Sequence, residues 1–382
     1  MSIVINVTYG GAGTGKTTAL VNDVKTLGGR SYIILSPTHS SLRNLTDKLT
    51  SEQGKNAKTV YSYFQIDYEN DHVVGPNKIV KHVFIDEFGL IKKELFKQII
   101  NKTSIALHKF IDTNRIPDFN INFYIYGDPV QLSPIYTTKR KISFTSLARY
   151  EIDSHLLPSF VIEHDYNSLF SLKVIREATK KLLTVNYRSN DDVLQIVRKL
   201  FYENDLSVIK YIDQMEVARL IVNEGYVFIS SKYDLHTSIY RLVQTMLVRK
   251  YAENEYKLMN ELMFYPGSRF LVAETSVSHK NGEYVTFDHI SGDKVFLKSG
   301  DAVFEYSNKL KLLPEFLITA HKSQGLTIPN VIVCTDNLFD ISMLYTMITR
   351  ASKSVLFFSN TNPDLTSYVA NFRSILQYYN YV

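Results

Sequence analysis

The chain has 382 residues, of which 45% are hydrophobic and 21% charged, a composition typical of a globular protein with room for two domains. A formal net charge of +5 permits a polyanionic partner without requiring one, and the single cysteine excludes a disulfide framework and a thiolate zinc site. The sequence has no apolar run long enough for a membrane span and no secretion-signal pattern, so we expect a soluble intracellular protein with no membrane partner.

The first predicted elements are a buried strand over residues 3–7, a glycine-rich loop and an amphipathic helix that ends at Gly28. The loop matches the pattern G-x-x-x-x-G-K-T in full, in the strand-to-helix context that a phosphate-binding loop requires. Glycines let backbone N–H groups approach a phosphate, while Lys16 suits the β- and γ-phosphates and the Thr17 hydroxyl suits Mg²⁺. The predicted nucleotide-binding residues are Gly10, Gly11, Ala12, Gly13, Thr14, Gly15, Lys16, Thr17 and Thr18.

Two further apolar strands each end in polar residues. The segment HVFIDEFGL (82–90) ends its apolar run at Asp86 and Glu87. At the carboxyl end of a parallel strand, Asp86 would hold Mg²⁺ and Glu87 would polarise the attacking water. The segment NFYIYGDPVQLSPI (122–135) places Gln131 in the next such loop, where an amide can contact the γ-phosphate or the water.

With these three segments in place, the chain resembles a superfamily 1 helicase, because further segments match the motifs of that family in order. They are LSPTHSSLRNL (35–45), TVYSYF (59–64), LLTVNYRS (182–189), ITAHKSQGLTIPNVIV (318–333) and MLYTMITRASKSVLFF (343–358). The motif PTHSS and a β-rich segment at 265–300, just before TAHKSQG, resemble features of the Dda and RecD branch. That branch moves 5′→3′ on single-stranded DNA.

The resemblance implies an α/β fold with two RecA-like P-loop domains in tandem that bind ATP and Mg²⁺ between them. It implies that Arg188 and Arg350, from the second domain, act as arginine fingers on the γ-phosphate, and that Gln324 links the nucleic acid to the ATP site. A planar, permanently charged guanidinium suits that task. With Lys16, Asp86, Glu87 and Gln131, the two arginines complete the predicted catalytic set.

The resemblance also implies a track for the nucleic-acid backbone. Short polar groups at strand-to-helix loops suit phosphate contacts that hold position without reading sequence. The predicted track residues are Pro37, Thr38, His39, Thr59, Ser62, Thr319, His321, Lys322 and Ser323. For the two histidines, an ordinary hydrogen-bonded loop role is the alternative.

The predicted domains are residues 1–160 and 165–382, with the segment around 149–160 as the hinge. Within the first domain, residues 65–81 alternate around turn residues and predict a β-hairpin, either a strand-separating pin or a mere connection. Within the second, residues 264–313 predict an SH3-like β insert.

We therefore expect an ATP-dependent 5′→3′ DNA helicase that acts as a monomer, with replication or repair proteins as further partners. A viral-type superfamily 1 RNA helicase and a nucleic-acid-stimulated ATPase subunit of a larger complex are the alternatives. The compact chain is typical of a protein encoded by a virus, phage or plasmid. In the resembled family, a segment ahead of the glycine loop carries a glutamine that reads the adenine base, but few residues precede the loop here. We therefore expect that other nucleotides could serve as substrate, or that a residue elsewhere or a partner protein reads the base.

Overall fold

The computed structural model describes residues 2–27, 31–67, 69–116, 119–132, 168–274, 276, 279 and 283–381. The expected hinge at 149–160, Tyr68 of the expected pin and residues 280–282 of the expected insert lie outside these residues. The chain forms two compact units, one of residues 1–188 and 366–382 and the other of residues 189–365. None of the helices in the described ranges has the length and apolarity of a membrane span.

The first unit is built on a six-stranded parallel sheet with the order β3-β2-β4-β5-β1-β6. The strands are β1 (Ile3–Gly10), β2 (Tyr32–Ser36), β3 (Ala57–Thr59), β4 (His82–Ile85), β5 (Ile121–Gly127) and β6 (Thr179–Leu183). The helices are α1 (Lys16–Lys25), α2 (His39–Thr46), α3 (Ser51–Gly54), α4 (Val60–Phe64), α5 (Lys93–Asn114), α8 (Lys173–Arg176) and α14 (Thr366–Tyr378). Short 3₁₀ turns are η1 (Phe88–Leu90) and η3 (Leu169–Ser171).

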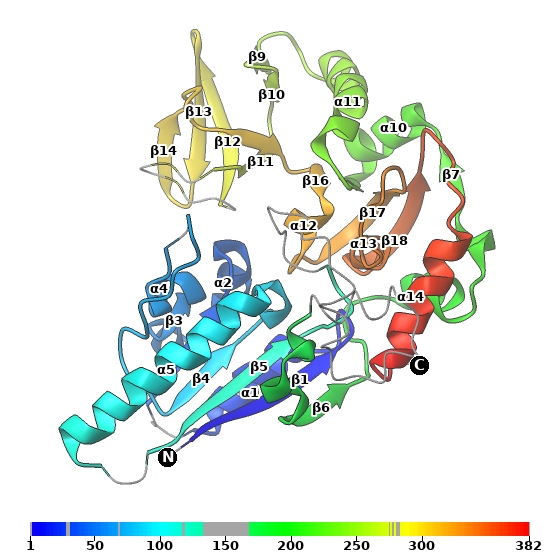
Figure 1. Cartoon of the computed structure of the whole chain (residues 1–382). Helices are drawn as coiled ribbons and strands as arrows, with labels where there is room; N and C mark the ends of the chain where they lie inside the picture. The colour runs from blue at the N-terminus through cyan, green and yellow to red at the C-terminus, as the bar shows by residue number, and fades with distance from the viewer. Residues whose placement is uncertain are drawn as a thin grey trace. The chain divides into compact units, whose positions relative to one another are not determined.

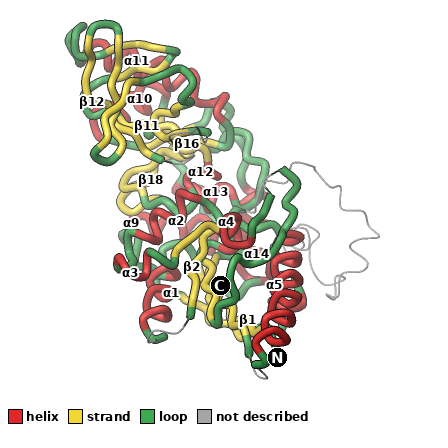
Figure 2. Tube along the Cα trace, turned by 90° about the vertical axis from the view of Figure 1, so that its left-hand side faces the viewer, coloured by secondary structure: helices red, strands yellow, loops and turns green. Residues whose placement is uncertain are grey.

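Helices cover both faces of this sheet, with α1 and α2 on one side and α5 on the other (Figures 1 and 2). Strand side chains alternate between the faces, so Phe84 of β4 packs with Leu20 and Val24 of α1. Parallel sheets buried on both faces require such apolar strands. The helices leave the carboxyl ends of β1, β4 and β5 to carry the polar loops predicted from the sequence.

The C-terminal segment belongs to the first unit. Tyr379 packs edge-on against Phe170, with ring centroids 5.6 Å apart, and Tyr381 packs against Tyr9 at 6.2 Å. Strand β6 also pairs in parallel with β1. These contacts correct the expected division at residues 160–165, because both β6 and α14 are bound into the first unit by pairing and packing with residues far away in the chain.

The expected pin at 65–81 does not form a two-stranded hairpin within its described residues. The single bridge joins Ile66 and Val73. Polar side chains take the place of a ladder, since the Asp67 carboxylate accepts hydrogen bonds from the Glu69 N–H and the Asn70 amide. Asp71 forms an ion pair with Lys92, just before α5, at 2.6 Å. The segment is therefore a compact polar turn tied to α5.

The second unit contains a five-stranded parallel sheet with the order β16-β8-β17-β18-β7. Its strands are β7 (Tyr211–Ile212), β8 (Val227–Ser230), β16 (Leu317–Thr319), β17 (Ile328–Cys334) and β18 (Ala351–Phe358). Its helices are α9 (Asp191–Val197), α10 (Gln214–Glu224), α11 (His236–Lys250), α12 (Ala320–Ser323) and α13 (Met343–Ile348), with a π turn η4 (Arg198–Tyr202) and 3₁₀ turns η5 (Leu206–Val208) and η6 (Tyr233–Leu235). Cys334 is a buried member of the core of this unit.

An all-β insert interrupts the second unit, as the sequence predicted. Its antiparallel sheet has the order β14-β13-β12-β11-β15 and stands apart from the parallel sheet in sequence and in hydrogen bonding (Figure 1). The strands are β11 (Arg269–Val272), β12 (Tyr284–Ser291), β13 (Lys294–Ser299), β14 (Ala302–Glu305) and β15 (Leu312–Pro314), preceded by the hairpin β9 (Lys257–Met259) and β10 (Leu262–Phe264). The insert has a core of its own around Phe270, Val285 and Leu297.

Candidate nucleotide site and nucleic-acid interface

The glycine loop joins the carboxyl end of β1 to α1. Gly13 and Gly15 both adopt φ of 80°, a left-handed conformation that glycine adopts without strain. A Cβ at Gly13 would lie 2.7 Å from both the Cβ of Arg188 and the side-chain oxygen of Asn186, so only glycine fits there. The loop is thus held in a curled form beside the first turn of α1, where backbone N–H groups and the helix dipole favour an anion.

Lys16 is buried at the centre of this loop. Its Nζ donates hydrogen bonds to the carbonyl oxygens of Gly10 and Gly11, at 2.8 Å each. Burial lowers the pKa of Lys16, whereas the negative charges of Asp128 and Glu87 raise it. The ammonium group is therefore held by neutral carbonyls within a ring of carboxylates, and a phosphate oxygen would be a stronger acceptor than either carbonyl.

Thr17 and Asp86 form the expected oxygen pair for a metal ion. The Thr17 hydroxyl donates to Oδ2 of Asp86 at 2.9 Å; Thr17 lies in the first turn of α1, and Asp86 directly follows β4. Burial, reinforced by the neighbouring charge of Glu87, raises the pKa of Asp86 to about 6. Two hard oxygen donors beside a phosphate loop fit Mg²⁺, which retains water and phosphate ligands and takes few from the protein.

The described residues contain no cluster of three or more His, Cys, Asp or Glu side chains suited to a metal. Glu87, the expected water-polarising residue, adopts φ of 49°, which is uncommon for a residue other than glycine. Such strain clusters at functional sites.

Gln131 lies after β5, as expected, and is held by a residue whose role the sequence did not reveal. Its Nε2 donates to Oδ2 of Asp128 at 3.0 Å, and Oδ1 of Asp128 accepts hydrogen bonds from the Val130 N–H at 3.1 Å and the Tyr381 hydroxyl at 3.0 Å. Burial raises the pKa of Asp128, and Lys16 opposes that shift. Asp128 therefore links the lysine, the glutamine and the C-terminal segment.

Residues 184–188 fold over the glycine loop within the first unit. The Asn186 side chain donates to the Ala12 carbonyl at 2.8 Å, and the Tyr187 N–H donates to the Gly13 carbonyl at 2.8 Å. Arg188 lies against Gly13 and its charge lowers the pKa of Lys16. This placement corrects the expectation that Arg188 comes from the second domain. The pairing of β6 with β1 brings it to the phosphate loop.

The ring of Tyr187 lies beside the same loop. It is 77% exposed, and a Cβ at Gly15 would lie 3.6 Å from it. An exposed aromatic face next to a phosphate site offers a platform for a nucleobase. No residue was assigned to base recognition from the sequence. The only feature that could have indicated Tyr187 is its position directly before Arg188.

The other predicted nucleotide-site residues lie in the second unit. Arg350 follows α13 and is only 1% exposed, with Nε donating to the Thr346 carbonyl at 3.1 Å. Gln324 is buried directly after α12. Their roles as finger and coupling residue stay predictions.

The predicted track residues of the first unit flank α2 and α4. Thr38 caps α2, since its hydroxyl accepts from the Ser41 N–H at 3.1 Å, and Thr59 caps α4 by accepting from the Ser62 N–H at 3.1 Å. Thr38 and Ser62 are exposed, His39 is half-buried, and Pro37 and Thr59 are buried. The two caps thus fix the starts of α2 and α4, where the exposed Thr38 and Ser62 can contact a phosphate.

In the second unit, the predicted track residues surround α12. Thr319 and Ser323 are buried, and the Ser323 hydroxyl donates to the Ala320 carbonyl at 2.7 Å. His321 and Lys322 are half-buried and face outward beside aromatic rings. The structure therefore leaves His321 and Lys322 as the accessible members of this group, with Ser323 in a structural role.

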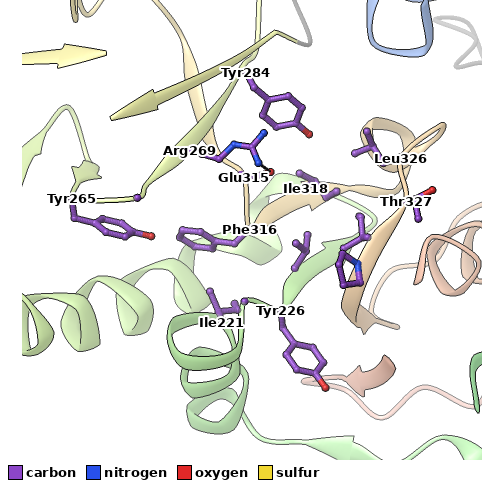
Figure 3. A pocket seen from close by; sticks show the side chains of 15 residues that line it. Ile221, Tyr226, Tyr265, Arg269, Tyr284, Glu315, Phe316, Ile318, Leu326 and Thr327 are labelled. Atoms are coloured by element: carbon purple, nitrogen blue, oxygen red, sulfur yellow. Dashed lines mark ion pairs between the residues drawn. The ribbon is translucent and has the colours of Figure 1, made fainter. Parts of the chain in front are cut away.

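A cavity of about 350 Å³ in the second unit lies at the opposite edge of its sheet, near the starts of β8, β16 and β17. Figure 3 shows the guanidinium of Arg269 between the ring of Tyr284 and the carboxylate of Glu315. The ion pair measures 3.1 Å, and the guanidinium lies 4.9 Å from the ring centroid. Because ligand chemistry in parallel sheets takes place at the carboxyl ends, this cavity is not part of the nucleotide site.

Two family models match the chain. The model described as an AAA domain matches residues 2–137, and the model described as a UvrD-like helicase C-terminal domain matches residues 315–357. The first covers the phosphate loop, Asp86 and Gln131, and the second covers α12 and Arg350. Both therefore coincide with the segments that carry the candidate site.

Solved structures of Pif1 helicases share the fold along nearly the whole chain. A structure of two coordinating Pif1 helicases at forked double-stranded DNA matches with a TM-score of 0.59 and 16% identity, covering 99% of this chain and 94% of that one. The Pif1 helicase of Candida albicans matches at 0.57 with 14% identity and the same coverage. Pif1 of Bacteroides bound to single-stranded DNA matches at 0.55 with 16% identity, covering 93% and 88%.

A curated protein of Danio rerio, mov-10-B.1, which is named as a helicase, is 22% identical over 245 residues. The match covers 52% of this chain and 22% of that protein, so the chain spans about a fifth of the length of this relative.

Proposed function

We propose that this chain is a superfamily 1 helicase of the Pif1/Dda-like branch, as its family-model matches and fold support, and that it uses ATP hydrolysis to move along single-stranded DNA and unwind duplexes. One observation carries the proposal: Lys16, the pair Thr17 and Asp86, and Gln131 converge at the carboxyl edge of the first sheet. That arrangement suits the triphosphate of a nucleotide and its hydrolysis.

Each residue of the first unit has a distinct role in this account. The glycine loop and Lys16 bind the β- and γ-phosphates, with the ammonium exchanging its carbonyl partners for phosphate oxygens. Glu87 accepts a proton from the attacking water, and Gln131, held by Asp128, orients that water. Thr17 and Asp86 would hold Mg²⁺, which would neutralise the negative charge that develops on the phosphate oxygens.

The arginines and the base platform are further parts of the proposal. Arg188, against Gly13, is close enough to the loop to stabilise negative charge on the γ-phosphate. Arg350 remains the candidate for the second finger. Tyr187 offers its exposed ring to the base, which would stack without strong selectivity among nucleotides.

The 5′→3′ direction and the DNA track are proposed from the same branch. The solved Pif1 structures include a complex with single-stranded DNA, which supports the DNA track. The polar turn at 65–81 is proposed as the strand-separating element. Replication or repair proteins remain proposed partners.

The experiment that tests the proposal measures ATP hydrolysis with and without single-stranded DNA, for the wild type and for Lys16→Ala. We expect DNA to stimulate hydrolysis by the wild type. In the variant we expect the rate of hydrolysis to fall at least about 100-fold, because Lys16 stabilises the negative charge on the transferred phosphoryl group. Hydrolysis that persists in Lys16→Ala would remove the nucleotide-site assignment.

A further inference from the structure

The cavity at the base of the β insert has the properties of a second ligand site. Its volume of about 350 Å³ lies within the range of small-molecule sites in proteins. Residues of α10, β8, β16 and β17 line it on one side, and residues of β11, β12 and the turn before β11 line it from the insert. All of them belong to the second unit. We call this space the insert cavity.

Flat and apolar side chains make up most of the wall of the insert cavity. The aromatic rings are those of Tyr226, Tyr265, Tyr284 and Phe316, and the aliphatic side chains include Ile221, Ile318 and Leu326 (Figure 3). Aromatic rings prefer to pack against other flat rings, in stacked or edge-on arrangements. The wall therefore favours a flat ligand with an apolar face.

The turn that carries Tyr265 holds its part of the wall in place. The Ser268 N–H donates to the Tyr265 carbonyl at 2.9 Å, and the Tyr265 N–H donates to Oγ of Ser268 at 3.1 Å. Gly267, at the third position, has a φ of 83°, as a type II turn requires. The Tyr251 hydroxyl donates to the Pro266 carbonyl at 3.3 Å. A wall that is already ordered lowers the entropy cost of binding a ligand.

One end of the insert cavity is polar and carries no net charge. Arg269 and Glu315 lie opposite each other, just beyond the pairing of β11 with β15, and the Glu315 N–H donates to the Arg269 carbonyl at 3.0 Å. Their side chains form an ion pair of 3.1 Å and are 48% and 33% exposed. The Arg269 guanidinium also lies 4.9 Å from the ring centroid of Tyr284, which helps to fix its position (Figure 3).

The ion pair leaves most of the hydrogen-bonding capacity of both side chains available. Within the described ranges, the contact between Nη1 of Arg269 and Oε1 of Glu315 is the only close polar contact of either side chain. A guanidinium carries five N–H donors, whereas a carboxylate only accepts. Because the two charges cancel, a neutral ligand with an acceptor beside its donors fits this end better than an ion does.

A guanine ring has this arrangement of acceptors and donors. Its O6 and N7 accept hydrogen bonds from an arginine, and its N1–H and 2-amino group are adjacent donors that match the two oxygens of a carboxylate. Adenine places the lone pair of N1 beside its amino group, and a carboxylate would repel that lone pair. The flat ring also suits the aromatic wall.

We propose that the insert cavity binds a guanine base, with the ring among the aromatic side chains and its polar edge at Arg269 and Glu315. Of the described residues that line the cavity, Arg269 is the one cation, so the site recognises the base and not a phosphate. Guanosine is therefore a sufficient ligand. The inference does not rest on the proposed function, because the glycine loop binds phosphates at a different edge of a different sheet.

Equilibrium dialysis of the full chain against radiolabelled guanosine tests the site, since a nucleoside has no phosphate for the glycine loop. We expect saturable binding by the wild type and equal binding by Lys16→Ala. Adenosine should bind at least about tenfold more weakly than guanosine. Absence of saturable binding up to about 1 mM guanosine, or equal affinity for the two nucleosides, would overturn the proposal.

Variants of the polar end test where guanosine binds. Glu315→Gln should weaken guanosine binding at least about tenfold, because its amide offers one acceptor where the carboxylate offers two. The matched control is Glu274→Gln, which removes a carboxylate of the insert that pairs with Lys311 at 2.7 Å and is not among the described lining residues. Equal affinity in these two variants would overturn the proposal. Arg269→Gln should also weaken binding about tenfold, and it provides the same test if Glu315→Gln does not fold.

Competition distinguishes a nucleoside from the base of a strand as the source of the guanine. Displacement of guanosine by oligothymidylate that carries a single guanine, and not by plain oligothymidylate, would support the guanine site with a strand as the source. Absence of displacement by either oligomer would support it with a free nucleoside or nucleotide. Equal displacement by both oligomers would contradict recognition of guanine. Since Lys16→Ala is expected to bind guanosine but not to hydrolyse ATP, failure of one assignment leaves the other standing.

Discussion

The hydroxyl of Tyr381 donates a hydrogen bond to Oδ1 of Asp128 at 3.0 Å, joining the segment after α14 to the loop after β5. The other carboxylate oxygen of Asp128 holds the amide of Gln131 at 3.0 Å. Because Asp128 is buried, its orientation depends on these few donors, and Tyr381 thereby helps to fix the glutamine at the nucleotide site.

Tyr381→Phe removes this bond and keeps the ring. Loss of a single hydrogen bond is worth about 1 kcal/mol, so we expect kcat for DNA-stimulated ATP hydrolysis to fall about fivefold with little change in KM for ATP. Tyr226→Phe is the control, because it removes a bond of 2.9 Å to Ser354 in the second unit. Equal losses in both variants, or a change in KM alone, would contradict a positioning role for Tyr381.

Gly13→Ala should abolish nucleotide binding or lower the melting temperature by several degrees. The added methyl group would meet Arg188 and Asn186 at 2.7 Å, at a φ of 80° that alanine tolerates poorly. Gly54→Ala, at a helical glycine with no atom within 4 Å of the added methyl group, should be neutral or slightly stabilising. Calorimetry and binding of a fluorescent ATP analogue measure both effects. Normal nucleotide binding by Gly13→Ala would show that the packing of residues 184–188 on the loop is not needed.

The raised pKa of Asp86 predicts how the stability of the protein depends on pH in the absence of nucleotide and Mg²⁺. Burial raises its pKa from 3.8 to about 6, and the charge of Glu87 reinforces that shift, whereas Thr17 and Lys16 favour the charged form. Between these two pH values the folded chain retains a proton that the unfolded chain releases, so this contribution to stability falls as the pH rises from about 4 to 6.

Asp86→Asn removes the buried charge, so the variant should melt a few degrees above the wild type at pH 7.5, with the difference vanishing near pH 4. The exposed Asp47→Asn should show no such trend. Hydrolysis by Asp86→Asn should be lost despite the higher stability, because a metal ligand is gone. A variant that is less stable than the wild type at pH 7.5 would contradict a buried, destabilising carboxylate.

Replacing residues 67–72 by a short glycine linker tests the polar turn. It removes the turn between the bridged residues Ile66 and Val73, and with it the ion pair between Asp71 and Lys92, which lies outside the parallel sheet. We expect unwinding of tailed duplexes to fall at least about tenfold, with DNA-stimulated hydrolysis within about twofold of the wild type. Lys92→Ala is a second variant that breaks the ion pair alone and leaves the turn in place. Unchanged unwinding in the linker variant would exclude the turn as the strand-separating element.

Local patterns predicted the parts of the site that lie within one strand-loop-helix unit. The run from Gly10 to Thr17 and the acid at Asp86 follow directly from apolar strands, and parallel pairing brings their carboxyl ends to one edge. The β insert was also predictable, since its turns and alternating strands are local.

Long-range contacts could not be predicted in this way. The Asp128 to Tyr381 bond joins residues 253 positions apart, and no local pattern marks either partner. The pairing of β6 with β1, which assigns Arg188 to the first unit, is likewise a contact between distant strands. At 65–81 the alternating pattern suggested a ladder, but the side chains of Asp67 and Asn70 satisfy the backbone instead.

The most direct test of the central claim is strand separation of matched DNA duplexes that carry either a 5′ or a 3′ single-stranded tail, with ATP and Mg²⁺ and with Lys16→Ala as the control. The account predicts unwinding of the 5′-tailed duplex alone, and none by Lys16→Ala. Unwinding of the 3′-tailed duplex alone would contradict the proposed direction. Unwinding of neither duplex, or equal unwinding by Lys16→Ala, would contradict an ATP-driven DNA helicase.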